Sequence, residues 1–317
     1  MNKKLSIVIP VYFNEASLDD LYSQLFDVKQ KLFPIGVEVE IIFVDDGSQD
    51  GSFEKLMRIQ NANGCVRVIK LTRNFGSVHA IKAGFRFVTG DCFAVLAADL
   101  QDPPILLVEM VKRWMGGSKF VICERMSRDD PLITKFFSKI YYKLLQLLVM
   151  KDFPEGGFDM VLMDKDMLPY MVNSAKNSYM ALLAFWLGFK PDVIQYHRRP
   201  RIHGKSRWTF SKKLKAFLDV MLGFSVTPIR AISAIGSIVS LMSFGYGALV
   251  VILALFEGNP VAGFPTVVAL ITFLLGLIIL MLGIIGEYLW RIFDEANSRP
   301  EVVIDKVYYL DSSTSDR

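Results

Sequence analysis

Cysteine and histidine are scarce in this chain, whose 317 residues include only three of each. Cys65, Cys92 and Cys123 stand far apart and form no C-x-x-C pair. Zinc sites and redox pairs are built from closely spaced Cys and His residues. We therefore expect neither role for these cysteines, which instead fit small apolar positions at strand edges in a reducing compartment.

Charge is missing from two long stretches near the C-terminus. Residues 231–256 and 258–286 are 26 and 29 residues long and contain no charged side chain. A helix that crosses the hydrocarbon core of a bilayer, roughly 30 Å thick, needs about 20 residues. We therefore predict two transmembrane helices within 229–291, with a pair of buried core helices as the alternative reading.

Lys and Arg are also missing from the segment between these stretches, residues 257–265, whereas both flanks carry them. Positive charge collects on the cytoplasmic side of membrane proteins. We therefore expect an integral protein of the inner (cytoplasmic) membrane, with the N-terminal domain and both termini in the cytoplasm. The predicted parts are a cytoplasmic catalytic domain (1–200), a basic juxtamembrane segment (201–228), two spans with a short external loop (229–291) and a cytoplasmic tail (292–317).

The positive charge of the chain is concentrated in one place. Residues 193–218 contain eight Lys or Arg and no acidic residue. Their position just before the first predicted span favours anionic lipid headgroups or phosphate ligands. The sequence contains no nucleic-acid-binding motif, and we expect no nucleic-acid partner.

The N-terminal part alternates short β-rich apolar runs with helical patterns. The predicted strands are Leu5–Pro10, Glu40–Val44, Val66–Leu71, Phe93–Ala97 and Phe120–Cys123, and the predicted helices lie near 17–33, 50–62, 77–88 and 104–116. Such alternation indicates an α/β fold with a mostly parallel sheet covered on both faces. Ligands of such sheets bind beyond the carboxyl ends of the strands.

Two further stretches, 130–151 and about 210–224, have an apolar and a basic face. Helices of this kind often lie in the membrane interface, so we expect amphipathic interfacial helices here. For residues 130–151, packing against the core of the protein itself is an equal alternative.

Carboxylates follow two of the predicted strands. Asp45 and Asp46 precede a turn and could bind a base or a ribose, or Asp46 could cap the next helix. Asp99 and Gln101 alternate onto one side of a segment expected to be extended, where their oxygens could share Mg²⁺ or Mn²⁺. Asp102 could simply cap the helix that follows.

Five motifs occur in an order that resembles a known family. They are Pro10-Val11-Tyr12-Phe13-Asn14-Glu15, Val44-Asp45-Asp46-Gly47-Ser48, Arg73-Asn74-Phe75-Gly76, Ala98-Asp99-Leu100-Gln101-Asp102-Pro103-Pro104 and Gly204-Lys205-Ser206-Arg207-Trp208. The chain resembles the inverting family-two glycosyltransferases, which have a Rossmann-like GT-A fold, over nearly its whole length. Within them it is similar to the polyisoprenyl-phosphate branch, which includes dolichol-phosphate mannose synthases and the glucosyltransferases of phage serotype-conversion operons. Bacterial members share two C-terminal spans and a Gly-Glu-Tyr-Leu ending, here Gly286–Leu289.

The resemblance implies roles for particular residues. The nucleotide would be bound by Pro10, Tyr12, Glu15, Asp45, Asp46, Asn74, Ala98 and Asp99. Mg²⁺ or Mn²⁺ would be held by Asp99 and Gln101 together with the diphosphate. Asp159 matches the acidic residue near the reacting centre, and Asp99, Asp159 and Arg207 are the candidate catalytic residues. The lipid phosphate or donor diphosphate would face Arg125, Arg128, Lys135, Ser138, Arg201, Lys205 and Arg207, although each of these cations could also be a solvated or lipid-facing charge.

Two positions depart from the family pattern. Ala97 stands where the family often has the first acid of a D-x-D motif, so one expected metal ligand is absent. Between Tyr12 and Asn14 there is one residue more than in the common P-x-Y-N-E form, which leaves the contacts of Tyr12 and Phe13 open.

The expected reaction is transfer of a hexose, with UDP-glucose as the favoured donor, to undecaprenyl phosphate or another polyisoprenyl phosphate, with inversion. The second pKa of a phosphate monoester is near 6, so the acceptor oxygen needs no strong base, and Asp159 is predicted to orient groups. The alternatives are a processive polysaccharide synthase and a non-catalytic membrane scaffold of the same fold. Relatives often form homo-oligomers, and we expect the same here.

Overall fold

The computed structural model describes residues 2–126, 157–176, 180–199, 227–257, 264–297 and 299–309, together with a few isolated residues between them (143, 145–147, 150, 153, 154, 221, 224 and 225). The chain divides into two compact units. The first consists of Met1–Ala216 and Pro300–Arg317, and the second consists of Phe217–Arg299. The second unit is therefore inserted, along the chain, between two parts of the first.

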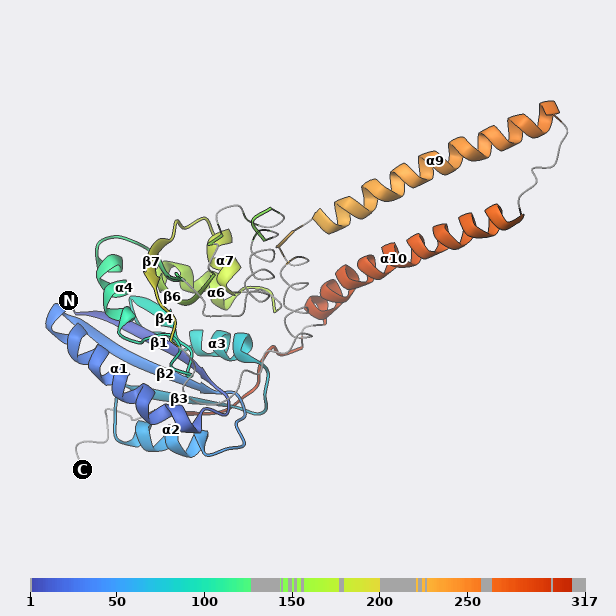
Figure 1. Ribbon diagram of the computed structural model, residues 1–317. Helices are drawn as coiled ribbons and strands as arrows, with labels where there is room; N and C mark the ends of the chain where they lie inside the picture. Colours follow the sequence, from blue (N-terminus) through green and yellow to red (C-terminus); the bar gives the residue numbers. More distant parts are fainter. Residues whose placement is uncertain are drawn as a thin grey trace. The chain divides into compact units, whose positions relative to one another are not determined.

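The first unit is built on an eight-stranded mixed sheet with the order β7-β5-β6-β4-β1-β2-β3-β8 (Figure 1). The strands are β1 (Lys3–Val11), β2 (Val37–Asp45), β3 (Val66–Leu71), β4 (Cys92–Val95), β5 (Phe120–Arg125), β6 (Phe158–Asp164), β7 (Asp192–Tyr196) and β8 (Ile304–Tyr308). The strands from β1 to β4 are parallel, as are β5 and β7. β6 runs antiparallel between β4 and β5, and β8 is antiparallel to β3. The prediction of an α/β fold with a mostly parallel sheet is thus confirmed.

Helices cover both faces of the sheet. One face carries α1 (Leu18–Leu32), α2 (Ser52–Asn61) and α4 (Leu106–Met115), and the other carries α3 (Ser77–Phe85), α6 (Leu168–Val172) and α7 (Met180–Trp186). Short 3-10 turns are η1 (Glu15–Ser17), η2 (Phe33–Ile35) and η3 (Lys165–Met167). Helices α1, α2, α3 and α4 lie where the periodicity of the sequence predicts helices.

Burial explains why these segments adopt their structures. Leu18, Leu21, Leu25, Val28 and Leu32 recur every three or four residues along α1 and are fully buried, as expected for a helix with one face on a sheet. On the opposite face, the rings of Phe85 and Phe93 lie 5.1 Å apart in an edge-to-face pair. A Cβ atom on Gly84 would lie 2.5 Å from Val8 Cγ1, so this glycine lets α3 pack closely against β1.

The second unit contains two long helices, α9 (Thr227–Glu257, 31 residues) and α10 (Phe264–Ala296, 33 residues). Residues Phe273–Ala296 of α10 form a helix of 24 residues that contains an 18-residue stretch with a mean hydropathy of 2.1, and this helix is long and apolar enough to cross a membrane. It is the one such helix among the residues that the structure describes. The other predicted span, residues 231–256, lies within α9 and remains a prediction.

Several expectations lie outside the described residues. They concern most of the two amphipathic stretches (130–151 and 210–224) and nearly all of the basic segment 201–228.

The three cysteines are free, with Cys92 and Cys123 buried and Cys65 partly exposed.

Candidate functional site

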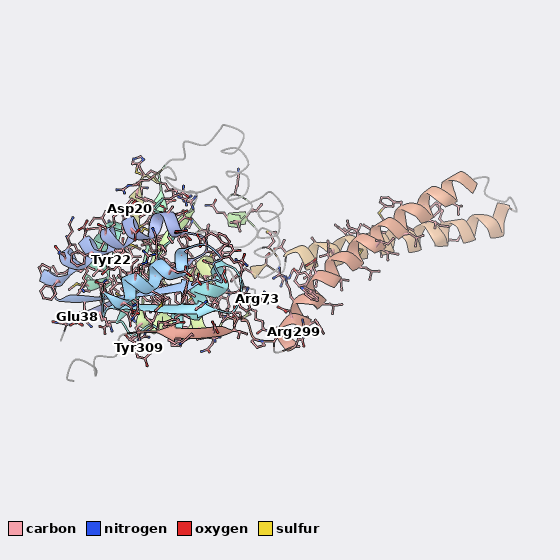
Figure 2. The ribbon with its side chains drawn as sticks, turned by 90° about the horizontal axis from the view of Figure 1, so that it is seen from below. Asp20, Tyr22, Glu38, Arg73, Arg299 and Tyr309 are labelled. Atoms are coloured by element: carbon pink, nitrogen blue, oxygen red, sulfur yellow. The ribbon has the colours of Figure 1, made fainter. Side chains whose placement is uncertain are left out.

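The carboxyl ends of the parallel strands meet at one edge of the sheet. Val11 is in register with Asp45, and Asp45 with Lys70, so the loops that follow β1, β2 and β3 lie side by side. The loop after β4 joins them, because β4 pairs with β1. Figure 2 labels Arg73 at this end of the first unit and Glu38 at the other. The polar motifs that follow β1, β2, β3 and β4 are therefore brought together at one edge, as predicted.

Asp46 holds two of these loops together. It is buried, and its carboxylate oxygens accept hydrogen bonds from the backbone N–H groups of Phe75 (2.7 Å) and Gly76 (2.9 Å). Burial raises the pKa of Asp46 although these bonds oppose the shift. The alternative that Asp46 caps the next helix is wrong, because α2 has Gly51 at its N-cap and no side-chain cap bond.

Asp45 is fully buried beside Asp46. One carboxylate oxygen accepts a hydrogen bond from Ser48 N (3.2 Å), and the other, Oδ2, is buried without a hydrogen-bond partner among the described residues. Burial raises the pKa of this carboxyl group. An unsatisfied buried carboxylate oxygen costs free energy, so Asp45 Oδ2 is suited to accept a hydrogen bond from a ligand.

Gly47 allows the loop after β3 to approach the loop after β2. Its φ of +69° is left-handed, and a Cβ atom there would lie 2.7 Å from the carbonyl carbon of Arg73. Any larger residue at position 47 must therefore displace the backbone of residues 72–76. We call residues 72–76 the β3 loop.

The extra residue in the first motif is accommodated by a left-handed turn. Phe13 has a φ of +56°, which is uncommon for a residue with a side chain. The turn is held by hydrogen bonds from Tyr12 N to Asn14 Oδ1 (2.9 Å) and from Phe13 N to Ser48 Oγ (3.2 Å). Tyr12 and Phe13 therefore stay at the sheet edge next to the Asp45 turn.

The other residues predicted to bind the nucleotide lie along the same edge. Glu15 Oε2 accepts a hydrogen bond from Gly51 N (3.0 Å), which ties the β1 loop to the start of α2. Ala98 is buried, and its carbonyl oxygen accepts a bond from Ser17 Oγ (2.7 Å). Asn74 is exposed in the β3 loop, and Pro10 is half-buried in β1.

Asp99 and Gln101 follow β4 in a turn. The expectation of an extended segment was wrong, because Leu100 between them is buried with a φ of +60°. The turn is closed by a hydrogen bond from Gln101 N to Asp99 Oδ1 (3.2 Å). The left-handed conformation of Leu100 buries its side chain, while the side chains of Asp99 and Gln101 stay half-buried.

The donor set at this turn fits a hard divalent cation better than a soft one. Asp99 and Gln101 offer carboxylate and amide oxygens, which suit Mg²⁺ or Mn²⁺. In the part of the chain that the structure describes, no group of three or more His, Cys, Asp or Glu residues gathers in a metal-binding arrangement. Mg²⁺ is often held by one or two carboxylates together with substrate phosphates, and the two residues fit that kind of site.

A second polar cluster lies where β5, β6 and β7 meet. Arg125, the last residue of β5, is in register with Tyr196 at the end of β7, and the antiparallel β6 brings Asp159 to the same edge. The Arg125 guanidinium donates a hydrogen bond to Asp159 Oδ1. Arg198 Nη2 lies 3.4 Å from the other oxygen of Asp159, so one carboxylate faces two guanidinium groups.

Asp102 extends this cluster toward the β4 loop. Its Oδ1 accepts a hydrogen bond from the Tyr196 hydroxyl and lies 3.4 Å from Arg198 Nε. Burial, together with the nearby charge of Asp159, raises the pKa of Asp102 to about 6. The alternative that Asp102 caps the next helix is wrong, because α4 begins after Ile105 and has no side-chain cap. We call Asp102, Arg125, Asp159, Tyr196 and Arg198 the arginine–aspartate cluster.

The sequence predicts two of the five residues of this cluster, Arg125 and Asp159, as site residues. Asp102 belongs to the fourth motif, but the sequence suggests only a capping role for it. Tyr196 and Arg198 were not singled out, although Arg198 belongs to the basic stretch 193–218. The remaining predicted phosphate-binding residues lie outside the described residues; they are Arg128, Lys135, Ser138, Arg201, Lys205 and Arg207.

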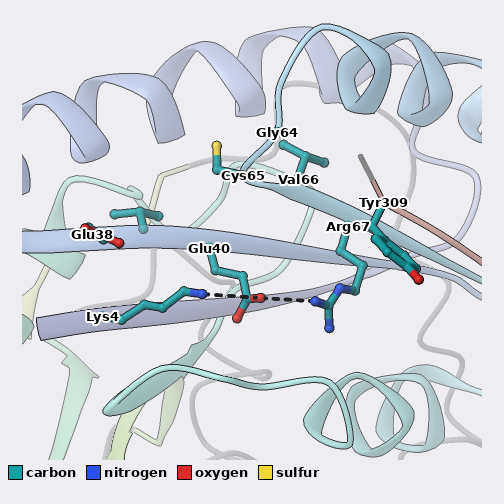
Figure 3. Close-up of a pocket in the computed structure, with 9 residues that line it drawn as sticks. Lys4, Glu38, Glu40, Gly64, Cys65, Val66, Arg67 and Tyr309 are labelled. Atoms are coloured by element: carbon teal, nitrogen blue, oxygen red, sulfur yellow. Dashed lines mark ion pairs between the residues drawn. The ribbon is translucent and has the colours of Figure 1, made fainter. Parts of the chain in front are cut away.

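A hollow of about 410 Å³ lies at the opposite end of the sheet and is separate from this site. It is lined by residues at the starts of β1, β2 and β3 and by Tyr309. Its two cations, Lys4 and Arg67, lie 3.8 and 3.6 Å from the buried Glu40 carboxylate (Figure 3). Glu40 also accepts a hydrogen bond from Ser6 Oγ (2.7 Å), so the cations of this hollow serve the structure.

Comparison with known proteins agrees with the motifs. Residues 6–172 match the family described as Glycosyl transferase family 2. An uncharacterized glycosyltransferase of Synechocystis sp. is 32% identical over 317 residues, covering 98% of each chain. A prophage-derived bactoprenol glucosyl transferase of Shigella flexneri is 32% identical over 305 residues, covering 96% of this chain and 98% of that one.

Solved structures share less of the sequence. Staphylococcus aureus TarS 1–349 in complex with UDP-GlcNAc is 15% identical, with a TM-score of 0.45 and coverage of 69% of this chain and 65% of that one. Glucosyl-3-phosphoglycerate synthase from Mycobacterium tuberculosis, in complex with Mn²⁺, UDP and glucosyl-3-phosphoglycerate, is also 15% identical, with a TM-score of 0.44 and coverage of 69% and 77%.

Proposed function

The chain belongs to glycosyl transferase family 2, and we propose that this enzyme transfers a hexose from a nucleotide-sugar to a polyisoprenyl phosphate with inversion of configuration. UDP-glucose is the favoured donor and undecaprenyl phosphate the favoured acceptor, and the product would be a lipid-linked sugar for modification of cell-surface glycans. The observation that carries the proposal is the similarity over nearly the full length of both chains to enzymes named bactoprenol glucosyl transferases.

The donor nucleotide would bind at the ends of β1, β2 and β3. Asp45 Oδ2 is buried and lacks a hydrogen-bond partner among the described residues, so it can accept a bond from the N–H group of a pyrimidine base. Asp46 acts indirectly here, because both of its oxygens hold the β3 loop. Pro10, Tyr12, Glu15, Asn74 and Ala98 complete the proposed nucleotide site.

The diphosphate would lie at the β4 turn. A divalent cation held there by Asp99 and Gln101 would neutralise charge on the departing nucleoside diphosphate. Because Ala97 stands where the family often has the first acid of a D-x-D motif, the protein supplies few metal ligands. The oxygens of the substrate would supply the other metal ligands.

The acceptor phosphate would bind beside the arginine–aspartate cluster. A phosphate monoester has a second pKa near 6 and is already a nucleophilic anion at neutral pH. Asp159 lies between Arg125 and Arg198, and in this position it orients the two guanidinium groups. The chain's own residues would thus align the phosphate with the sugar, and a single displacement needs no strong general base.

The acceptor's lipid tail requires the reaction to occur at a membrane. α10 is apolar and long enough to cross one, and α9 contains 26 residues in a row without a charge. We propose that both cross the membrane, with the α/β unit and both termini in the cytoplasm. The basic residues 198–215 would then face anionic headgroups and the acceptor phosphate.

The test is transfer of radiolabel from a panel of UDP- and GDP-sugars to undecaprenyl phosphate, using the full chain in detergent with and without Mg²⁺ or Mn²⁺. We expect one labelled lipid carrying a single sugar, formed only with the metal and lost in Asp99→Ala. Asp166→Ala is the matched control, because Asp166 is an exposed carboxylate that pairs with Lys119 just before β5, at the opposite end of the sheet from the motifs.

Two outcomes would contradict the proposal. A product that lengthens with time would identify a processive synthase. If a folded chain gave no lipid-linked product with any donor, although it bound nucleotide-sugar in an equilibrium titration, the acceptor assignment would be wrong.

A further inference from the structure

The chain returns to the sheet after α10. Residues 301–309, which we call the C-terminal strap, run along β3 at the edge of the sheet. β8 pairs antiparallel with β3, with Val68 opposite Tyr308 and Leu71 opposite Ile304. In agreement with this direction, Figure 2 shows Tyr309, near the end of the strap, close to Glu38 and distant from Arg73. The strap therefore begins at the end of β3 where the proposed donor site lies.

Glu301 opens the strap and contacts α3 through two ion pairs. Its carboxylate lies 2.9 Å from His79 Nδ1 and 2.8 Å from Lys82 Nζ. The side chains of Glu301 and Lys82 are 8% and 4% exposed, so this pair is shielded from water and from salt. Lys82 Nζ also donates to the carbonyl oxygen of Ser174, which links α3 to the segment after α6.

The titration of Glu301 reflects these partners. Burial alone would raise the pKa of its carboxyl group, but the hydrogen bonds and charges of His79 and Lys82 outweigh burial, and the pKa is lowered. Glu301 is therefore a charged carboxylate that is almost completely shielded from water. Removing it would leave the Lys82 ammonium buried with, among the described residues, the carbonyl oxygens of Ser174 and Ala175 as its remaining partners.

The strap holds the β3 loop at both ends. At the start of the loop, Thr72 N donates a hydrogen bond to Val303 O (3.1 Å). At its far end, the loop leads into α3 at Gly76, and α3 is fixed by Glu301. The middle of the loop is held from the other side by Asp46, through the N–H groups of Phe75 and Gly76. Glu301, which lies 222 positions after His79 in the sequence, thus completes the support of the β3 loop.

We propose that Glu301 is a positioning residue for the donor, which acts through Lys82 and His79 to keep the β3 loop in place for nucleotide-sugar binding. This proposal rests on the proposed function in so far as the β3 loop, with Asn74, lies in the donor site. Glu301 itself touches no substrate. Its loss lowers donor affinity because binding must then order a looser loop.

The experiment compares Glu301→Ala, Glu301→Gln and Asp305→Asn in the full chain. Asp305 is the matched control, because it is an exposed carboxylate on the same strand, β8. For each variant, the dissociation constant for UDP-glucose, the KM for donor and acceptor, kcat, and the hydrogen exchange of residues 72–78 without ligand are measured.

We expect Glu301→Ala to weaken donor binding by about two- to thirtyfold, the range for changes in residues that act on a site through a packed network. The KM for the acceptor and kcat should change little, and exchange at residues 72–78 should become faster. Glu301→Gln keeps the shape and can still accept one hydrogen bond, so it should recover part of the loss. Asp305→Asn should match the wild type in every measurement.

The outcomes separate this inference from the proposed function. If both Glu301 variants kept wild-type donor affinity and wild-type exchange at residues 72–78, the positioning role would be refuted. A uniform loss of stability with no selective effect on donor KM would also refute it. If the wild type made no lipid-linked sugar, the proposed function would fail, while the exchange of residues 72–78 would still test whether Glu301 holds the loop.

Discussion

Replacing Asp159 by asparagine would remove the negative charge that Arg125 and Arg198 share while keeping the size of the side chain. The Arg125 side chain is 8% exposed and that of Asp159 is 26% exposed, so the pair is only partly screened by water. Breaking a buried ion pair costs about 3–5 kcal/mol, whereas an exposed pair contributes about 0–1 kcal/mol. For this intermediate case we expect the free energy of unfolding to fall by about 1–3 kcal/mol.

The effect on turnover distinguishes an orienting carboxylate from a general base. If Asp159 only orients the two guanidinium groups, the misplaced acceptor should lower kcat about 10- to 100-fold. The pH profile between pH 6 and 8 should keep its shape, because the acceptor phosphate with its second pKa near 6 still sets it. A general base contributes about 100- to 10,000-fold, and its loss would also change that profile.

The assay is initial-rate transfer to undecaprenyl phosphate at several pH values, together with chemical denaturation. Asp192→Asn is the control, since Asp192 forms a more exposed ion pair with Arg113 (2.5 Å) at the start of β7, away from the cluster. It should lose about 0–1 kcal/mol of stability and keep its turnover. Near-normal turnover of Asp159→Asn from pH 6 to 8 would refute the orienting role, and a loss beyond about 1,000-fold with an altered pH profile would show that Asp159 is a base.

Three further measurements test other parts of the structure. Gly47→Ala should destabilise the fold by about 1–3 kcal/mol in thermal denaturation and weaken donor binding, because the new Cβ would strain a left-handed backbone and meet the backbone of Arg73. The stability difference between wild type and Glu301→Gln should be full above the ordinary Glu pKa of 4.5 and should shrink as the pH falls through the lowered pKa of the folded state; a difference that grew on acidification would contradict the ion pairs. A thiol reagent should label Cys65 in the native chain and all three cysteines after unfolding, because the other two are buried with raised pKa values.

The sequence was sufficient to predict the central strands, because each is a short apolar run followed by a turn or a helix. β1 to β5 lie in a sheet covered by helices on both faces, and most of their residues are buried, which produces the continuous apolar pattern. β8 has exposed Asp305 and Lys306 in five residues at the edge of the sheet, so its pattern is too short and too polar to be distinguished from a tail. Its pairing with β3, more than 200 residues earlier, depends on a long-range contact that local periodicity does not encode.

The sequence predicts those site residues that have polar side chains and lie at the carboxyl end of a strand. Asp45 ends β2 and Asp99 lies in the turn after β4, and a parallel sheet brings such positions to one edge. The arginine–aspartate cluster could not be predicted in this way, because Asp102 and Tyr196 are 94 residues apart and meet only because β7 pairs with β5. The turn at Leu100 was misjudged because a leucine in a left-handed conformation has no signal in the sequence.

The charges of the cluster bear on how two anionic substrates can meet. Asp102 and Asp159 face Arg125 and Arg198, so two carboxylates balance two guanidinium groups when all four are charged. The acceptor phosphate and the donor diphosphate would bring about two negative charges each. The cluster can orient these groups, but it has little net positive charge to offset their repulsion. We infer that the offset comes from the divalent cation at Asp99 and from the basic residues 199–215, which explains why so many cations follow β7 directly in the sequence.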